Sequence, residues 1–172
     1  MNRLATAAAL VLLAAAPVPA LAQGGLSAGH LGAAFGVSFP TGSLSDRHSS
    51  GFNLAGTAEY RAPGQPMGVR GEIFYEHFAA EPGVPGARSV QTTAALVSAV
   101  YNVQGSSVHS YFIGGMGLYS VTGGGTHPGF SGGVGIRIPL TGMTAYFEAR
   151  LHKVLTDGSS YLSLPITFGL SF

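Results

Sequence analysis

Apolar residues fall on every second position over most of this chain, which is the spacing of β-strands and not of helices. The pattern is clearest in the last twelve residues, YLSLPITFGLSF, where large apolar side chains occupy the even-numbered positions from Leu162 to Phe172. Small residues, polar residues and Pro165 fill the positions between them. A strand with one face this apolar needs an apolar medium to face, and Pro165 predicts a bulge or an unpaired carbonyl within it.

Similar alternating stretches recur along the chain, separated by clusters rich in Gly, Pro, Ser and Asp. The first, third and fifth connections are long, the second, fourth and sixth are tight, and the seventh is intermediate. This alternation is typical of an up-and-down barrel in which one rim faces outside and the other faces the periplasm. The sequence therefore predicts an all-β, eight-stranded antiparallel up-and-down β-barrel. The expected strands are 29–39, 51–61, 67–78, 89–103, 108–121, 130–140, 144–155 and 161–172.

The two faces of most expected strands differ in polarity. In the second strand, for example, Phe52, Leu54 and Tyr60 share one side, while Glu59 and Arg61 lie on the other. The third, sixth and seventh strands sort in the same way. The fourth and fifth strands carry apolar residues on both faces, so their orientation stays open.

Charge decides between two barrels that both fit this alternation. A soluble barrel such as a lipocalin turns the apolar face inward, whereas a transmembrane barrel turns it toward lipid. Charged residues make up only 9% of the sequence, against about a quarter in soluble domains. The polar face carries equal numbers of glutamates and arginines, as an enclosed interior requires, which favours the transmembrane barrel. The expected lumen ion-pair network is Glu59, Arg61, Arg70, Glu72, Glu76, Arg137, Glu148 and Arg150.

Aromatic residues are expected at both edges of the lipid-facing band, where they form the girdles of membrane barrels. Ordinary cross-strand aromatic pairs are the alternative explanation. Lys153 lies on the apolar face near the outer rim, where it could reach toward lipid phosphates. The expected girdle residues are Tyr60, Tyr101 and Tyr111 near the tight connections, and Phe39, Tyr75 and Tyr119 near the long ones.

Residues 1–22 have the pattern of a secretory signal peptide: a short positive start, an apolar stretch and a small-residue end at Ala20-Leu21-Ala22. The apolar stretch is too short to span a bilayer as a helix. We expect cleavage after Ala22 and one mature domain at 23–172. That domain is formally neutral and lacks cysteine, so it gives no indication of a nucleic-acid partner and has no disulfides.

The signal peptide, the eight-strand rhythm and the terminal strand ending in Phe172 resemble the small bacterial outer-membrane β-barrel proteins, the OmpA-like transmembrane barrels. The resemblance spans residues 23–172. It implies a monomer in the cell outer membrane, in contact with membrane lipids and lipopolysaccharide. In this family the terminal aromatic strand is read by the machinery that inserts barrels. The resemblance assigns that role to Tyr161, Leu162, Leu164, Ile166, Phe168, Leu170 and Phe172.

We expect a non-enzymatic protein without cofactor or metal, because no histidine pair has metal-ligand spacing. Eight strands leave an interior that side chains fill, so the ion-paired lumen should be plugged against ions. The outer loops would then serve envelope stabilisation or surface interaction.

Two other functions stay open. One is a secreted soluble barrel that holds a small apolar ligand inside. The other is a lipid A-modifying enzyme that uses His48 and Ser49, although this stretch is expected to form an exposed loop. Three other histidines are expected at a rim (His109), in a loop (His127) and, for His152, as a lumen partner of Glu148 or Arg150.

Overall fold

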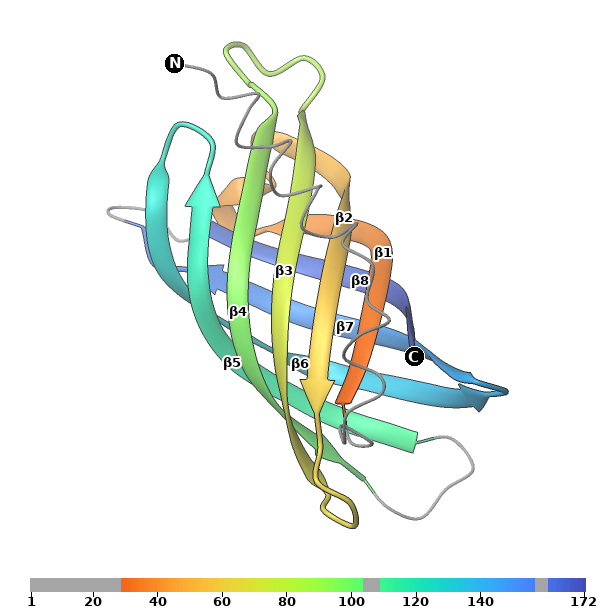
Figure 1. Cartoon of the computed structure of the whole chain (residues 1–172). Helices are drawn as coiled ribbons and strands as arrows, with labels where there is room; N and C mark the ends of the chain where they lie inside the picture. The colour runs from red at the N-terminus through yellow and green to blue at the C-terminus, as the bar shows by residue number, and fades with distance from the viewer. Residues whose placement is uncertain (1–28, 104–108, 157–160) are drawn as a thin grey trace, which may run out of the picture.

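The computed structural model describes residues 29–103, 109–156 and 161–172, which form a closed antiparallel barrel (Figure 1). Each strand pairs with its neighbours in sequence, and β1 pairs with β8 to close the ring. A short 3-10 turn, η1 (Gly42–Leu44), follows β1. The described residues include no helix that is long and apolar enough to cross a membrane. The strands are β1 Gly29–Thr41, β2 His48–Tyr60, β3 Met67–Ala80, β4 Val90–Asn102, β5 His109–Val121, β6 Gly125–Leu140, β7 Met143–Val154 and β8 Tyr161–Ser171.

The predicted fold class, strand number and strand order are confirmed. Among the connections that the structure describes in full, one differs from the prediction. β6 begins at Gly125, five residues earlier than expected, so β5 and β6 join through a tight turn in place of a long loop. Gly123 and Gly125 have φ angles of 79° and 88°, which only glycine adopts readily. These two glycines allow Thr126 and Pro128 to continue the ladder with β5.

The barrel has two unlike rims. We call the end that carries the β2–β3 and β6–β7 connections the short-turn rim. The opposite end, which carries the β1–β2, β3–β4 and β5–β6 connections, is the long-loop rim. Figure 1 shows the β3–β4 connection rising above the barrel and the β2–β3 turn at the other end.

The outer surface is apolar over the full circumference, since every strand turns large apolar side chains outward. Met116 is 63% exposed, and Val97 and Phe35 are each 60% exposed. Four of the expected girdle residues, Phe39, Tyr60, Tyr75 and Tyr101, also lie on this outer face. Such an apolar surface would be unstable in water.

The expected orientation is wrong for two girdle residues. Tyr111 and Tyr119 point into the lumen and are each 1% exposed. The outer face of β5 is formed by Phe112, Met116 and Leu118. Because β5 carries apolar residues on both faces, period 2 alone could not choose between them.

The closing strand β8 is continuous despite Pro165. Its pairing with β7 skips two positions, between Ala149↔Ile166 and His152↔Ser163, without a shift in register. The pairing with β1 continues through Ser38↔Pro165. The structure therefore has no bulge at Pro165. It does have a local gap in pairing, because proline has no N–H to donate.

The lumen has two chemically different halves. Polar and charged side chains fill the half near the short-turn rim. The half near the long-loop rim holds a cluster of buried apolar side chains, which we call the apolar plug. Leu44, Val90 and Val121 pack against it from the long-loop rim. The plug consists of Phe74, Phe78, Ala94, Leu96, Tyr119, Val154 and Tyr161.

Candidate functional site

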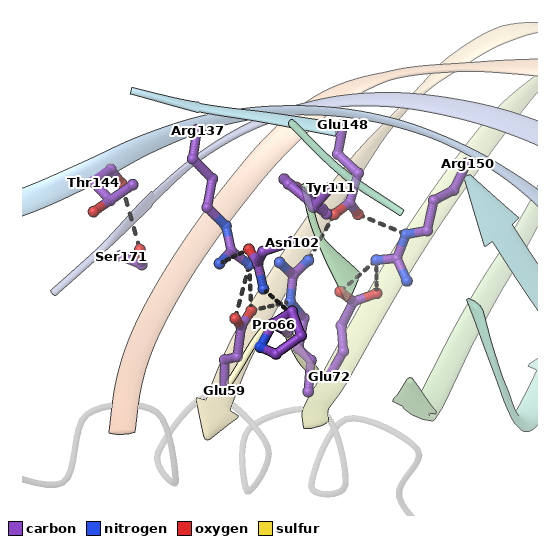
Figure 2. A network of polar contacts seen from close by, with 11 residues as sticks. Glu59, Pro66, Glu72, Asn102, Tyr111, Arg137, Thr144, Glu148, Arg150 and Ser171 are labelled. Atoms are coloured by element: carbon purple, nitrogen blue, oxygen red, sulfur yellow. Dashed lines mark hydrogen bonds and ion pairs between the residues drawn. The ribbon is translucent and has the colours of Figure 1, made fainter. Parts of the chain in front are cut away.

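Charged side chains of alternating sign form one continuous chain across the short-turn half of the lumen (Figure 2). Arg137 contacts Glu59 at 2.7 Å, and Glu59 accepts a 3.0 Å hydrogen bond from Arg70. Arg70 also pairs with Glu148 at 2.7 Å, and Glu148 contacts Arg150 at 2.6 Å. The last link joins Arg150 to Glu72, with 2.6 Å between the guanidinium and Oε1. We call these six residues the ion-pair chain.

The barrel topology explains why these groups meet. Each member lies at a lumen-facing position of β2, β3, β6 or β7. Glu59 and Arg70 are direct partners in the β2–β3 register. The Arg70–Glu148 pair instead joins β3 to β7 across the lumen. Since a buried charge is costly unless it is paired, the alternation of signs compensates each charge of the chain locally.

Aromatic rings support the arginines of the chain. The Tyr111 hydroxyl donates a 2.6 Å hydrogen bond to Glu148. The Tyr111 ring centroid lies 4.5 Å from the guanidinium carbon of Arg137 and 5.5 Å from that of Arg70. Arg137 also donates a 3.0 Å hydrogen bond to the Asn102 side chain, which holds the Arg137 guanidinium in place at the end of the ion-pair chain. Cation–π contacts of this kind stabilise arginine where water is excluded.

Two tyrosine rings of the lumen lie directly over glycines of the adjacent strand. Tyr111 faces Gly135 in the β5–β6 register, and Tyr146 faces Gly169 in the β7–β8 register. A Cβ atom added at either glycine would overlap the neighbouring ring. The glycines thus provide the space in which these rings lie flat against the barrel wall.

Two residues predicted for the network lie outside the ion-pair chain. Glu76 is 1% exposed and accepts hydrogen bonds from Tyr161 (3.1 Å) and Ser163 (3.0 Å). Arg61 follows β2 at the short-turn rim. Among the described residues, no ion pair includes either side chain. The chain therefore contains three residues of each sign where the sequence predicted four.

The predicted partner of His152 is also wrong. Its Nδ1 lies 3.2 Å from the Tyr119 hydroxyl, and its ring packs on Phe74 with centroids 4.8 Å apart. Tyr119 could not be foreseen as the partner because the orientation of β5 was open. His127 lies within β6 and not in a loop, with its Nε2 2.6 Å from the Gly124 carbonyl.

The terminal strand separates Tyr161 from the rest of its predicted motif. Tyr161 faces the lumen, where its hydroxyl accepts a hydrogen bond from Thr92 at 3.0 Å and donates one to Glu76. The even-numbered members lie on the opposite, outer face. These are Leu162, Leu164, Ile166, Phe168, Leu170 and Phe172.

The histidine and serine residues at the start of β2 bond to different partners and not to each other. The Ser49 hydroxyl donates to Glu81 at 2.7 Å, whereas His48 Nδ1 lies 3.0 Å from the Leu44 carbonyl. In the described part of the chain, no hydrogen bond joins His48 to Ser49. The same part contains no group of three or more His, Cys, Asp or Glu residues that could hold a metal ion.

Sequence reasoning missed a cavity at the short-turn rim. It has a volume of about 180 Å³ and adjoins the Arg137 end of the ion-pair chain. The cavity could have been predicted from the alternation of side chains at the strand ends, which assigns every second residue there to the lumen face. The cavity is lined by His30, Thr57, Glu59, Arg61, Arg70, Asn102, His109, Arg137, Pro139, Thr144, Tyr146 and Ser171.

Several solved structures share this architecture. Neisserial surface protein A (NspA) aligns with a TM-score of 0.64 at 18% identity, covering 86% of this chain and 97% of that one. A major outer membrane protein of Thermus thermophilus aligns at 0.55 and 17% identity, covering 84% and 99%. Ail, the attachment invasion locus protein of Yersinia pestis, aligns at 0.53 and 17% identity, with the same coverage. No family model and no curated protein match the sequence. This chain has the fold of the small eight-stranded transmembrane β-barrels of bacterial outer membranes.

Proposed function

We propose that the protein is a non-enzymatic integral barrel of the outer membrane, with a lumen closed to ions. Its outer loops would act in envelope stabilisation or surface interaction. The observation that carries this proposal is the inversion of polarity across the wall. The outside is apolar on every strand, and charged groups are enclosed and paired inside. A membrane barrel requires this inversion, and a soluble barrel would reverse it.

Two layers in series support a closed lumen. The ion-pair chain crosses the short-turn half from β2 and β3 to β6 and β7. The apolar plug fills the long-loop half, with Phe78 and Val154 fully buried. An ion would have to displace paired charges and then enter an apolar region, and each step is costly.

The outer face suggests the partners. Lys153 is exposed on β7, near the long-loop rim, between Phe130 of β6 and Leu162 of β8. We propose that it reaches lipid or lipopolysaccharide phosphates. The even-numbered side chains of β8, ending at Phe172, would present the signal to the barrel-insertion machinery. Residues 1–22 would direct export, and the barrel would act as a monomer.

A planar-bilayer recording tests the closed lumen. Purified protein should give no steady ion conductance at moderate voltage, whereas a known porin in the same bilayer conducts. Open-channel steps that rise with protein concentration would contradict the proposal. Parallel fractionation should place the protein in outer membranes, with a band that shifts on boiling in SDS gel electrophoresis. Recovery in the soluble fraction without a shift would instead support the inverted, ligand-holding barrel.

A further inference from the structure

The cavity at the short-turn rim has a marked excess of positive charge. Arg61, Arg70 and Arg137 line it, together with His30 and His109, against the single carboxylate of Glu59. Glu59 already accepts hydrogen bonds from Arg70 and Arg137. The acidic group in the cavity is therefore neutralised by the network itself.

Arg61 is the cation that the ion-pair chain does not use. The chain holds three glutamates and three arginines and is formally neutral. Arg61 lines the same cavity, and no ion pair within the described residues includes it. Its charge leaves this end of the lumen with a net positive field.

The remaining lining groups can serve an anion as well. Thr57 and Thr144 bring hydroxyl groups to the wall. The Ser171 hydroxyl already donates to the Thr144 carbonyl, and the Asn102 amide already donates to the Pro66 carbonyl. Hydroxyl groups and guanidinium N–H groups are all hydrogen-bond donors. Arginine matches phosphate geometry with two parallel donors.

The size of the cavity restricts its ligand. About 180 Å³ is below the roughly 300–1,000 Å³ typical of pockets for drug-sized molecules. A ligand here must be small, and the arginines favour one with a compact, multiply charged head.

We propose that this cavity binds the phosphate group of a small anion, with Arg61 as its principal contact and with added positive charge from Arg137, whose terminal nitrogens already donate to Asn102 and Glu59. The site is independent of the long-loop rim, where surface interactions would occur. The cavity lies inside the barrel at the short-turn rim, so a soluble anion can enter it from the water at that end. A lipid headgroup that folds over the rim is the other source of the same chemistry.

The test uses inorganic pyrophosphate and the full barrel in phosphatidylcholine nanodiscs, measured by isothermal titration calorimetry at constant ionic strength. The wild type should show saturable binding that weakens as NaCl is raised. Arg61→Gln should weaken binding about tenfold, the loss of one charge-assisted contact. Arg61 lies outside the strands and the ion-pair chain, so this variant should keep the heat-modifiable band of a folded barrel.

Arg88→Gln is the matched control, because Arg88 is an exposed arginine of the β3–β4 connection at the opposite rim. It should leave the affinity unchanged. Absence of saturable binding to the wild type would overturn the proposal, as would equal weakening by Arg61→Gln and Arg88→Gln. Repeating the titration in discs with phosphatidylglycerol identifies the source. Unchanged affinity indicates a soluble anion, whereas competitive loss indicates a lipid headgroup phosphate in the same cavity.

Discussion

The two halves of the lumen close the same barrel by opposite means. In the short-turn half, Arg70 is held between Glu59 and Glu148, and each contact is both an ion pair and a hydrogen bond. In the long-loop half, Phe74 and Phe78 are buried among other apolar side chains. The first arrangement depends on specific charged partners, and the second depends mainly on how well apolar side chains fill the volume. The two halves should therefore respond differently to substitution.

The difference is clearest in what one deletion leaves behind. Removing a charge from the ion-pair chain leaves one opposite charge uncompensated in a region that water does not reach. Removing an apolar side chain from the plug leaves a cavity, whose cost depends on how far the neighbours can relax. Glu76 is the exception, because this carboxylate lies in the long-loop half with hydroxyl partners only.

The largest expected effect is that of Arg70→Ala. It leaves Glu59 with only Arg137 and Glu148 with only Arg150 as cationic partners. We expect the free energy of unfolding to fall by about 3–5 kcal/mol, measured by urea unfolding in lipid vesicles. Glu72→Ala, which leaves Arg150 with only Glu148 as an anionic partner, should have an effect in the same range. Arg61→Ala is the matched control, because no ion pair among the described residues includes Arg61, and a change of about 0.5 kcal/mol or less is expected. An unchanged urea midpoint for Arg70→Ala would show that the chain does not hold the short-turn half together.

A smaller effect is expected for Gly135→Ala. The added methyl group would overlap the Tyr111 ring and displace it from Glu148 and Arg137. Overpacking of this kind costs about 1–3 kcal/mol, again measured by urea unfolding. Gly56→Ala is the control, because an added Cβ there meets no atom within 4 Å. If the two variants were equally stable, the ring would be free to move and the glycine would not be needed for packing.

The smallest effect, and the opposite sign, is expected for Glu76→Gln. Glutamine keeps an acceptor for Tyr161 and Ser163 but removes a buried charge that has no cationic partner among the described residues. Stability at neutral pH should stay unchanged or rise by about 1 kcal/mol. Glu148→Gln, made in the ion-pair chain, should instead destabilise the barrel. A large loss of stability in Glu76→Gln would mean that both halves depend on charge.

The sequence predicted the barrel because strand period and connection length are local properties. Phe52 and Leu54 flank the polar Asn53, and both side chains are exposed on the outer face as expected. The orientation of β5 could not be predicted in this way. Tyr111 and Phe112 are both aromatic. The space above Gly135 in the next strand and the hydrogen bond to Glu148 favour the inward position of Tyr111.

The ion-pair chain could be predicted only in part for a related reason. Strand parity places Glu59, Arg70 and Glu76 on the lumen face. It does not say which of them reach the arginines of β6 and β7. That depends on height along the barrel axis, which follows from the register of all the strands together. Glu76 lies too far toward the long-loop rim, and Tyr161 and Ser163 hydrogen-bond it there.

The tyrosine rings that lie over glycines imply a rule for how this sequence can change. With the strand number fixed, the interior has a fixed volume, so an atom gained at one wall position must be lost at a facing one. Gly135 and Tyr111 should therefore vary as a pair, and so should Gly169 and Tyr146. A bulkier residue at Gly135 would be tolerated with a smaller one at Tyr111. Substitutions that each destabilise the barrel alone could restore it together.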